Sequence, residues 1–304
     1  RRFTDDYLQK MPKKRILVAP LNWGLGHATR CIPIIEALEN QGFEPVIASD
    51  GVALALLKKE FPHLEALELP SYKIEYAQNG ENFKWKLFKQ IPNMFSAVQN
   101  ERKKTLQWVH ELKLDGIISD NRLGIHSSKI PSVFITHQVT LPPKAGRLAQ
   151  AVHRKWMNRF DAVWIMDDAE IRLAGALSHP VEKSTYIGFY SRFQGQEISV
   201  VPGKIVGIVS GPEPYSAQLF DWIINRYGTE QLVLISPKVY SNVPENVRVI
   251  NNWKQADTEI ASAETIISRN GYSTLMDLQF LNKKAVLIPT PGQLEQEYLG
   301  QLKR

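Results

Sequence analysis

The sequence predicts an α/β protein with two units of parallel β-sheet flanked by helices. Short apolar runs alternate with helix-length segments between residues 15 and 190, a pattern that is typical of parallel sheets. A polar segment with several Gly and Pro residues interrupts this alternation near residues 187–203, and the alternation restarts at Lys204. The composition agrees with a folded globular chain, since 43% of the residues are hydrophobic and 22% are charged.

The first unit is expected to span residues 15–190, after an N-terminal extension at residues 1–14. Helices are expected between most of its strands, and Asp50 is placed to cap the second helix. Lysines and aromatic residues fill an insert at about residues 72–112, where we expect two basic helices. The strands are expected at residues 15–19, 45–49, 64–69, 116–119, 131–136 and 162–166.

The second unit is expected to span residues 204–304, after a linker at residues 191–203. Helices are expected from Ser216 and from Ser273 to Leu281. Residues 294–304 read as a helix that has barely begun, so we expect a longer native protein or a truncated copy. The strands are expected at residues 204–209, 231–235, 248–250, 265–267 and 285–288.

Charge and cysteine content limit the functional classes. The net charge is +6, and the whole excess lies in residues 1–190, which indicates either an anionic partner or only better solubility. The single cysteine, Cys31, excludes an intramolecular disulfide and a cysteine-based metal site, and it points to a reducing compartment. No apolar run approaches a membrane span, the N-terminus has no secretory pattern and no nucleic-acid module is present. We therefore expect a cytoplasmic protein with no nucleic-acid partner.

A glycine-bearing turn with Gly24, Gly26 and His27 joins the first strand to the first helix. Glycines there let a ligand approach the backbone, and ligands of open α/β sheets bind at the carboxyl ends of strands. The dinucleotide fingerprint fails at Arg30, so no nicotinamide or flavin cofactor is expected. His27 is either a catalytic residue or a structural residue at a helix start.

A second motif, at residues 268–277, lies between a strand and a helix. Gly271 permits a tight turn, and the hydroxyls of Ser273 and Thr274 with free backbone N–H groups form a seat for a diphosphate. Asp277 follows on the first turns, where a carboxylate can accept ribose hydroxyls. The alternative is an ordinary N-capped helix with an acidic residue near its start.

A third motif, at residues 288–297, is a Pro- and Gly-rich loop that leads into a helix. The first turn of that helix holds Glu295, Gln296 and Glu297, whose carboxylates and amide bond sugar hydroxyls well. A solvated helix start is the alternative reading.

Residues 268–277, 285–292 and 295–297 resemble the donor-binding half of MurG-like glycosyltransferases, the UDP-N-acetylglucosamine transferases of cell-envelope glycan synthesis and their relatives. The residues from Gly24 to His27 resemble the G-G-H loop of that family, and Thr136-His137-Gln138 is similar to its H-E-Q segment. The resemblance runs from about Arg15 to the end of the chain, in the same order.

This resemblance implies the GT-B architecture, in which two Rossmann-like domains face each other across a cleft. It also implies a UDP-sugar donor, no metal and no cofactor. On the acceptor side it places Gly24, Gly26, His137 and Gln138. The implied donor-side residues are Asp277 at the ribose, Ser273 and Thr274 near the diphosphate with Arg269 and Gly271 in the same motif, Gln296 and Glu297 at the sugar, Asn252 and Trp253 near uracil, and Ser210 and Gly211 in a phosphate loop. Pro212-Glu213-Pro214 and Glu297 depart from the family pattern.

The expected reaction moves a hexose or N-acetylhexosamine from a UDP-sugar to an acceptor hydroxyl. His27 is the expected base, and Asp120, which follows a predicted strand, stands where relatives have the aspartate that orients this histidine. One direct displacement inverts the anomeric carbon. A nucleotide-sugar epimerase, a UDP-sugar hydrolase and a non-catalytic nucleotide-sugar sensor are the alternatives.

The basic insert has two readings. Residues 84–89 and 102–104 mix cations with aromatic side chains, and such segments can lie on anionic membrane surfaces. A glycan or lipid-linked acceptor and a peripheral position at the inner face of the membrane fit that reading. The alternative is an amphipathic helix docked on the sheet with its lysines in solvent.

Overall fold

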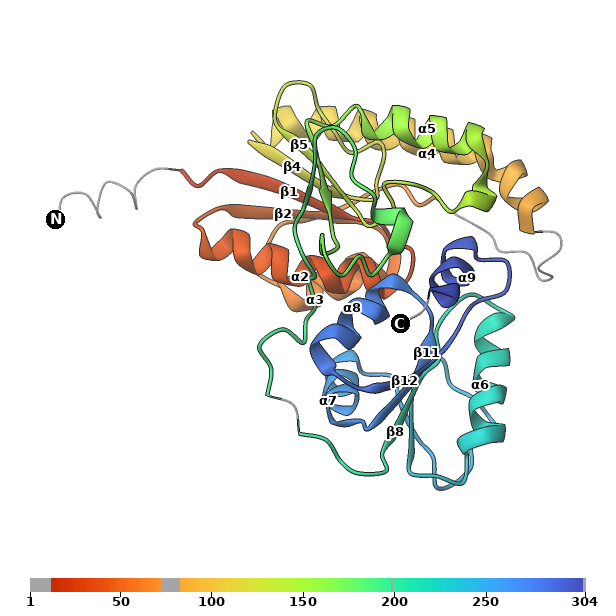
Figure 1. Cartoon of the computed structure of the whole chain (residues 1–304). Helices are drawn as coiled ribbons and strands as arrows, with labels where there is room; N and C mark the ends of the chain where they lie inside the picture. The colour runs from red at the N-terminus through yellow and green to blue at the C-terminus, as the bar shows by residue number, and fades with distance from the viewer. Residues whose placement is uncertain (1–11, 73–82, 198, 303–304) are drawn as a thin grey trace, which may run out of the picture.

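The computed structural model describes residues 12–72, 83–197 and 199–302 of the chain. Within these residues the strands form two sheets, one of seven strands and one of five, in which every paired strand is parallel. The two sheets form separate layers with helices against them (Figure 1). The predicted α/β class with two parallel sheets is confirmed.

The seven-stranded sheet has the order β3-β2-β1-β4-β5-β6-β7. From β1 to β3 the strands are added on one side of β1, and from β4 onward they are added on its other side, so the direction of strand addition reverses between β1 and β4. Such a reversal places the carboxyl ends of the central strands beside a crevice. The strands are β1 (Arg15–Pro20), β2 (Glu44–Ser49), β3 (Ala66–Glu68), β4 (Gly116–Asp120), β5 (Ser132–Thr136), β6 (Ala162–Ile165) and β7 (Ser184–Tyr186). The sequence analysis did not predict β7.

The helices of this unit cover both faces of its sheet. In Figure 1, α2 (Leu25–Asn40) and α3 (Gly51–Glu60) lie below the sheet, while α4 (Phe83–Glu111) and α5 (Arg147–Met157) lie above it. This arrangement follows from right-handed crossovers between parallel strands. Two short 3₁₀ helices, η2 (Pro143–Ala145) and η3 (Gly175–Ser178), lie in the connecting segments.

The insert forms one long helix where two were expected, although residues 73–82 lie outside the described part. Pro92 falls within α4, where a proline removes a backbone hydrogen bond and costs about 3 kcal/mol. Buried positions at Ala97, Val98, Glu101 and Thr105 recur at helical spacing. The burial of this stripe on the sheet offsets the cost of the proline.

Asp50 precedes α3 as expected, but its side chain does not cap that helix. Its carboxylate instead accepts hydrogen bonds from the buried Arg122 and from Asn22. A charged partner forms a stronger hydrogen bond than a neutral backbone N–H group, so the ion pair replaces the cap.

The five-stranded sheet has the order β10-β9-β8-β11-β12. Ser268 and Arg269 belong to the end of strand β11 and not to the turn that follows it; the sequence analysis also did not predict α7. The elements are β8 (Ile205–Ile208), α6 (Tyr215–Tyr227), β9 (Leu232–Ile235), β10 (Arg248–Ile250), α7 (Trp253–Ser262), β11 (Thr265–Arg269), α8 (Tyr272–Leu281), β12 (Lys284–Ile288) and α9 (Leu294–Gln301).

One hydrophobic cluster joins the two units. It packs Ile34, Ile135 and Met166 of the first unit against Leu275 and Met276 of α8. In Figure 1, α8 lies directly beneath α2, and α9 lies beside the loops that follow the first sheet. The two sheets are therefore held together at the edge where the candidate functional residues lie.

Candidate active site

The centre of the candidate site is a pair formed by His27 and Asp120. His27 lies in the first turn of α2, and Asp120 is the last residue of β4. Because β1 and β4 are neighbours, the turn after β1 and the end of β4 meet at one edge of the sheet. His27 Nδ1 lies 3.1 Å from Asp120 Oδ2. The structure thus brings the two expected catalytic residues into direct contact.

A third residue, Arg30, completes this cluster and was not among the expected site residues. It lies three residues after His27, one turn along the same helix, and is only 2% exposed. Its Nε donates to Asp120 Oδ2 at 2.7 Å, its Nη2 donates to Asp120 Oδ1, and Nη2 also lies 2.8 Å from His27 Nδ1. The residue that breaks the dinucleotide fingerprint is therefore the buried counter-ion of Asp120.

The pKa values of Asp120 and His27 depend on each other and on the charge of Arg30. Burial would raise the pKa of Asp120, but the charge of Arg30 and then that of His27 outweigh it and hold this pKa far below its usual value. Burial and the Arg30 charge lower the pKa of His27. At neutral pH the cluster therefore holds an ionised carboxylate, a guanidinium and a neutral imidazole.

The second unit contributes Glu295, which reaches the acceptor side across the interface. Its Oε1 lies 2.8 Å from His137 Nε2, and its Oε2 accepts from the amide of Gln138. The His137 ring stacks on Tyr272 of α8, with centroids 4.0 Å apart and planes 3° apart. Burial would raise the pKa of Glu295, but the charge of His137 and its hydrogen bond lower it overall.

The turn before His27 approaches the start of α8 very closely. A Cβ atom on Gly26 would lie 2.5 Å from Ser273 Oγ, so only glycine fits. Gly24 precedes α2 with φ of 76°, a conformation that favours glycine. Gly26 thus lies at the junction with the expected diphosphate seat, and Gly24 precedes it at the start of the same helix.

The diphosphate seat is the N-terminus of α8. Gly271 is the N-cap residue of α8, and Ser273 and Thr274 lie in its first turn. Neither hydroxyl caps the helix, because the cap position falls on Gly271. The first backbone N–H groups of a helix lack helical partners and favour an anion.

Two further expected residues surround this seat. Gly211, in the loop that begins at Ser210 after β8, has φ of 102° and nothing within 4 Å of an added Cβ. Arg269 donates from Nη1 to Pro289 O at 3.2 Å and from Nη2 to Tyr215 O. Arg269 therefore ties two loops of the donor side together through their carbonyls.

Asp277 binds the segment between the two units. Its Oδ1 accepts from Ser191 Oγ at 2.6 Å, and its Oδ2 accepts from Arg192 Nη1 at 3.0 Å. Burial raises the pKa of Asp277, although Arg192 opposes this. Each carboxylate oxygen keeps a second lone pair, so these bonds leave acceptor capacity for a ligand hydroxyl.

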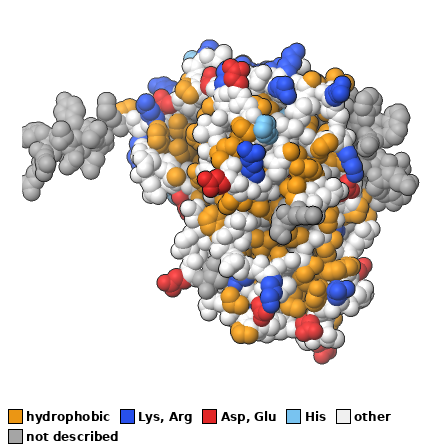
Figure 2. Space-filling model, viewed as in Figure 1, with side chains coloured by type: hydrophobic (Ala, Val, Ile, Leu, Met, Phe, Trp, Pro, Cys, Tyr) orange, Lys and Arg blue, Asp and Glu red, His pale blue; other side chains and the backbone are white. Residues whose placement is uncertain are grey.

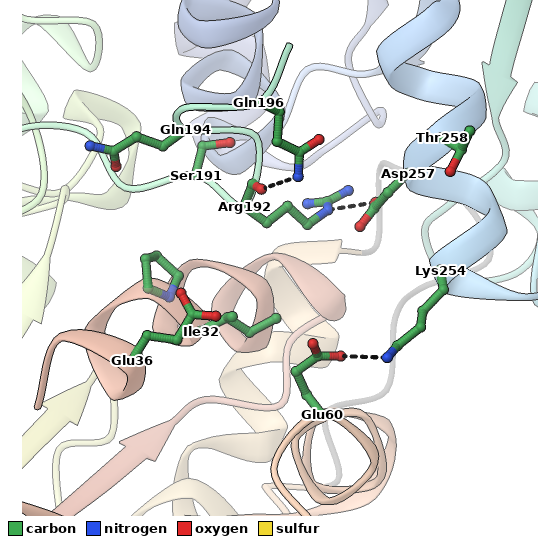
Figure 3. Close-up of a pocket in the computed structure, with 11 residues that line it drawn as sticks. Ile32, Glu36, Glu60, Ser191, Arg192, Gln194, Gln196, Lys254, Asp257 and Thr258 are labelled. Atoms are coloured by element: carbon green, nitrogen blue, oxygen red, sulfur yellow. Dashed lines mark hydrogen bonds and ion pairs between the residues drawn. The ribbon is translucent and has the colours of Figure 1, made fainter. Parts of the chain in front are cut away.

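Arg192 also lines a cavity of about 530 Å³ between the two units. Figure 3 shows Glu36 of α2, Glu60 of α3 and Lys254 of α7 around it, and Arg192 donating to Asp257. The Arg192 Nε to Asp257 Oδ1 distance is 2.7 Å. Ligand pockets are commonly about 300–1,000 Å³, so this cavity is large enough for a nucleoside.

The remaining expected donor residues lie at the start of α9 and at the start of α7. Gln296 Oε1 accepts from Thr290 N, and Glu297 Oε1 accepts from Gly292 N, both at 2.8 Å. These bonds shape the loop before α9 and leave the amide NH₂ of Gln296 outside them. Asn252 caps α7 by accepting from Lys254 N at 3.1 Å, and Trp253 begins that helix.

Comparison with known proteins agrees with this geometry. Residues 213–299 match the glycosyltransferase family 28 C-terminal domain. The structure is similar to that of MurG from Acinetobacter baumannii, with a TM-score of 0.54 and 14% identity over 95% of this chain and 82% of that one. The chain is a glycosyltransferase with the GT-B fold and a C-terminal domain of glycosyltransferase family 28.

Two other relatives extend the similarity over nearly the whole glycosyltransferase. An uncharacterized glycosyltransferase from Methanosarcina acetivorans is 23% identical over 316 residues, covering 93% of this chain and 81% of that protein. The spinosyn rhamnosyltransferase SpnG complexed with thymidine diphosphate has a TM-score of 0.65 and 15% identity, covering 92% of this chain and 82% of that one. The SpnG structure supports the GT-B fold, and the Methanosarcina relative supports the glycosyltransferase class.

The described regions of the glycosyltransferase contain no candidate metal site and no candidate membrane-spanning helix. No group of three or more His, Cys, Asp or Glu side chains among the described residues is arranged to hold a metal ion. Within the same residues, no helix combines the length and apolar character needed to cross a bilayer.

Proposed function

We propose that this glycosyltransferase moves a hexose or N-acetylhexosamine from a UDP-sugar to an acceptor hydroxyl, with inversion and without a metal. The observation that carries the proposal is the position of the His27–Asp120 pair. The glycine turn before His27 touches the start of α8, so the imidazole lies close to the helix N-terminus that favours a diphosphate.

In the proposed reaction His27 acts as the base. His27 Nδ1 lies 3.1 Å from Asp120 Oδ2 and 2.8 Å from Arg30 Nη2. The proposed base role requires the tautomer whose Nδ1–H donates to Asp120, which leaves the lone pair of Nε2 for the proton of the acceptor hydroxyl. The acceptor oxygen bonds to the anomeric carbon while the bond from that carbon to the diphosphate breaks, and the proton passes to His27. Asp120 then stabilises the imidazolium beside Arg30.

The leaving diphosphate gains stabilisation from the second unit. The N-terminus of α8 offers unpaired N–H groups and the positive end of the helix dipole. The Ser273 and Thr274 hydroxyls lie in the same turn. This arrangement supplies donors where negative charge develops, which lowers the barrier without a metal.

The nucleoside fits the cavity beside Arg192. Asp277 lies further along α8 than the diphosphate seat, and its partner Arg192 lines the cavity. Ile32 and Glu36, which line the opposite wall, lie further along α2 than His27. A nucleotide laid along these two helices therefore runs from the anion seat, past Asp277, into the cavity. The thymidine diphosphate of the SpnG complex supports a nucleoside diphosphate in this fold.

The donor sugar then faces α9. The amide of Gln296 and the carboxylate of Glu297 lie at the start of that helix, and these groups bond sugar hydroxyls well. A carboxylate at Glu297 favours a sugar that presents a hydroxyl donor at that position.

The acceptor is a glycan or a lipid-linked glycan, and for a lipid-linked acceptor the enzyme lies peripherally at the inner face of the membrane, with α4 and α5 of the first unit toward the lipid. Figure 2 shows Lys and Arg side chains gathered over this unit. On α5, Leu148 is 80% exposed, and Trp156 contacts Phe95 of α4 edge to face. Exposed apolar side chains beside cations are typical of surfaces that bind anionic membranes.

Product analysis with UDP-hexoses in EDTA tests this function. We expect sugar transfer only when an acceptor is present, and an inverted anomeric product. His27→Ala should lower turnover by roughly 10²–10⁴-fold while UDP affinity stays nearly unchanged. UDP release or epimerisation without an acceptor indicates a hydrolase or an epimerase. UDP-sugar binding without any product indicates a sensor, and wild-type turnover in folded His27→Ala removes the base from the mechanism.

A further inference from the structure

A second cavity, of about 350 Å³, lies in the first unit on the α4 side of the sheet. The C-terminal unit packs against α2 and α3 on the other side (Figure 1). Four basic or titratable side chains line this cavity: Arg102 and Lys103 of α4, His126 of the loop after β4, and Arg159 after α5. The cavity is therefore separate from the candidate active site.

The loop that carries His126 is fixed tightly against α4. A Cβ atom on Gly124 would collide with the backbone carbonyl of Val98, so only glycine allows this approach. Arg102 donates to the backbone carbonyl of His126, and the imidazole packs on Phe160 with ring centroids 5.2 Å apart. The imidazole is therefore held in one orientation, with 6% of its residue surface exposed.

The hydrogen bonds of His126 determine which nitrogen carries its proton. Arg102 Nη1 lies 2.9 Å from His126 Nδ1, and a guanidinium can only donate. Nδ1 therefore accepts, and the neutral ring carries its hydrogen on Nε2. Among the described residues, this buried Nε2 has no hydrogen-bond partner. The Nε2–H group is buried beside the cavity, and the imidazole contacts the lining cation Arg102, so the ring responds to an anion that binds Arg102.

The positive charges around this donor lack balancing acids. None of the ion pairs found among the described residues involves Arg102, Lys103 or Arg159. Burial and then the Arg159 charge lower the pKa of Arg102. Burial, Arg102 and Arg159 lower the pKa of His126 to about 4, although Asp161 opposes them.

The two nearest carboxylates already have partners. Glu101 is fully buried and binds Arg122 Nη1 at 2.7 Å, with Tyr72 as a further donor. Asp161 accepts from Ser132 N at 2.8 Å. Arg122 compensates the charge of Glu101, and the single charge of Asp161 does not outweigh those of Arg102, Lys103 and Arg159, so the potential of the cavity is positive at neutral pH.

We propose that this cavity is a binding site for a phosphate group, held by the cations of Arg102, Lys103 and Arg159 beside the buried imidazole of His126. A phosphate carries enough acceptor oxygens to meet these donors together, and charge-assisted hydrogen bonds to it are strong. The phosphate belongs either to a soluble phosphate compound or to a lipid headgroup. The proposal does not depend on sugar transfer, because the cavity lies on the opposite face of the sheet.

Inorganic phosphate and histidine NMR test the site directly. The chain has 7 histidines, so ring-labelled histidine gives few signals, and the His126 signal is the one missing in His126→Phe. We expect phosphate at about 1 mM to shift this signal in the wild-type chain. The readout is specific to this cavity, because a phosphate at the start of α8 does not contact His126.

Matched variants distinguish a built site from general charge attraction. Arg159→Gln removes a cation that lines the cavity, and Arg154→Gln removes an equally exposed cation of α5 that does not line it. We expect Arg159→Gln to weaken the phosphate effect about tenfold and Arg154→Gln to leave it nearly unchanged. The absence of any His126 shift, or equal weakening in both variants, overturns the proposal.

Vesicles identify the source of the phosphate. Co-sedimentation with phosphatidylcholine vesicles, with and without phosphatidic acid, is measured for the same variants. Binding that requires phosphatidic acid and is lost in Arg159→Gln but not in Arg154→Gln indicates a lipid headgroup. A phosphate-dependent His126 shift without such vesicle binding indicates a soluble phosphate compound.

Discussion

Replacing Arg30 by methionine separates its role at His27 from its role in stability. The substitution keeps an unbranched side chain at this position of α2 but removes the guanidinium that binds both oxygens of Asp120. Asp120 is fully buried, so it is left with an incompletely compensated charge. Breaking a buried ion pair in this way costs about 3–5 kcal/mol, which lowers Tm by roughly 6–15 °C.

The second effect of Arg30→Met is on the acid limb of the activity profile. Arg30 Nη2 lies 2.8 Å from His27 Nδ1, and its charge adds to burial in lowering the pKa of His27. Two unit charges about 4 Å apart interact by about 4 kcal/mol at an effective dielectric of about 20, and one pKa unit is about 1.4 kcal/mol. Removing the Arg30 charge should therefore raise the pKa of His27.

The assay is kcat/KM for sugar transfer as a function of pH, measured below the Tm of each variant. In the wild-type enzyme activity falls as His27 gains a proton, with a midpoint below the ordinary histidine value of about 6.5. In Arg30→Met we expect this midpoint to move upward, because the charge that helps to lower the pKa of His27 is gone.

Arg122→Met is the matched control. Arg122 is also fully buried and binds two acids, Asp50 and Glu101, but the structure shows no contact between it and His27. We expect a comparable loss of stability and an unshifted acid limb. If both variants shift the limb equally, or if neither does, Arg30 does not tune His27 and the electrostatic reasoning is refuted.

Three further predictions follow from other contacts. Asp277→Ala should weaken UDP binding by about 1–3 kcal/mol, measured by calorimetry in EDTA; unchanged affinity contradicts the ribose role. Glu295→Gln removes the charge that pairs with His137 across the two units and should lower Tm by several degrees, whereas Glu297→Gln, whose Lys144 pair is exposed, should change it little. Because the folded pKa of His126 is about 4 and its unfolded value is about 6.5, only the unfolded chain gains this proton between those values. Stability should therefore fall as pH decreases from about 6.5 to 4, and less steeply in His126→Phe.

The order of elements could be predicted because it depends on local patterns. Apolar runs too short for helices, such as β1, alternate with amphipathic segments, and this alternation indicates parallel sheets. The single helix of the insert could not be predicted, because the proline at Pro92 is a local signal for a break. Its continuity depends on burial of later turns against the sheet, which is a tertiary effect.

The His27–Asp120 pair was predicted from the resemblance to relatives whose histidine is oriented by an aspartate. The topology explains the pair, because His27 follows β1 and Asp120 ends the neighbouring strand β4. The signal for Arg30 was also present, since a charged residue one turn after His27 must share its face of the helix. In the sequence analysis this arginine served only to exclude a dinucleotide fingerprint. The contact between Glu295 and His137 spans 158 positions, and no local pattern indicates it.

In the proposed reaction, the contacts between the two units are expected to depend on donor binding. Ser273 touches the Gly26 turn, and Glu295 binds His137 and Gln138, so the same side chains that line the expected donor site also hold the two units together. A donor sugar that enters between His27 and α8 must replace these direct contacts with its own. Separating the two units costs the free energy of these contacts, and the contacts of the bound nucleotide sugar must offset that cost. Weakening the Glu295 pair therefore eases donor entry and slows closure, which couples KM and turnover to one carboxylate that does no chemistry itself.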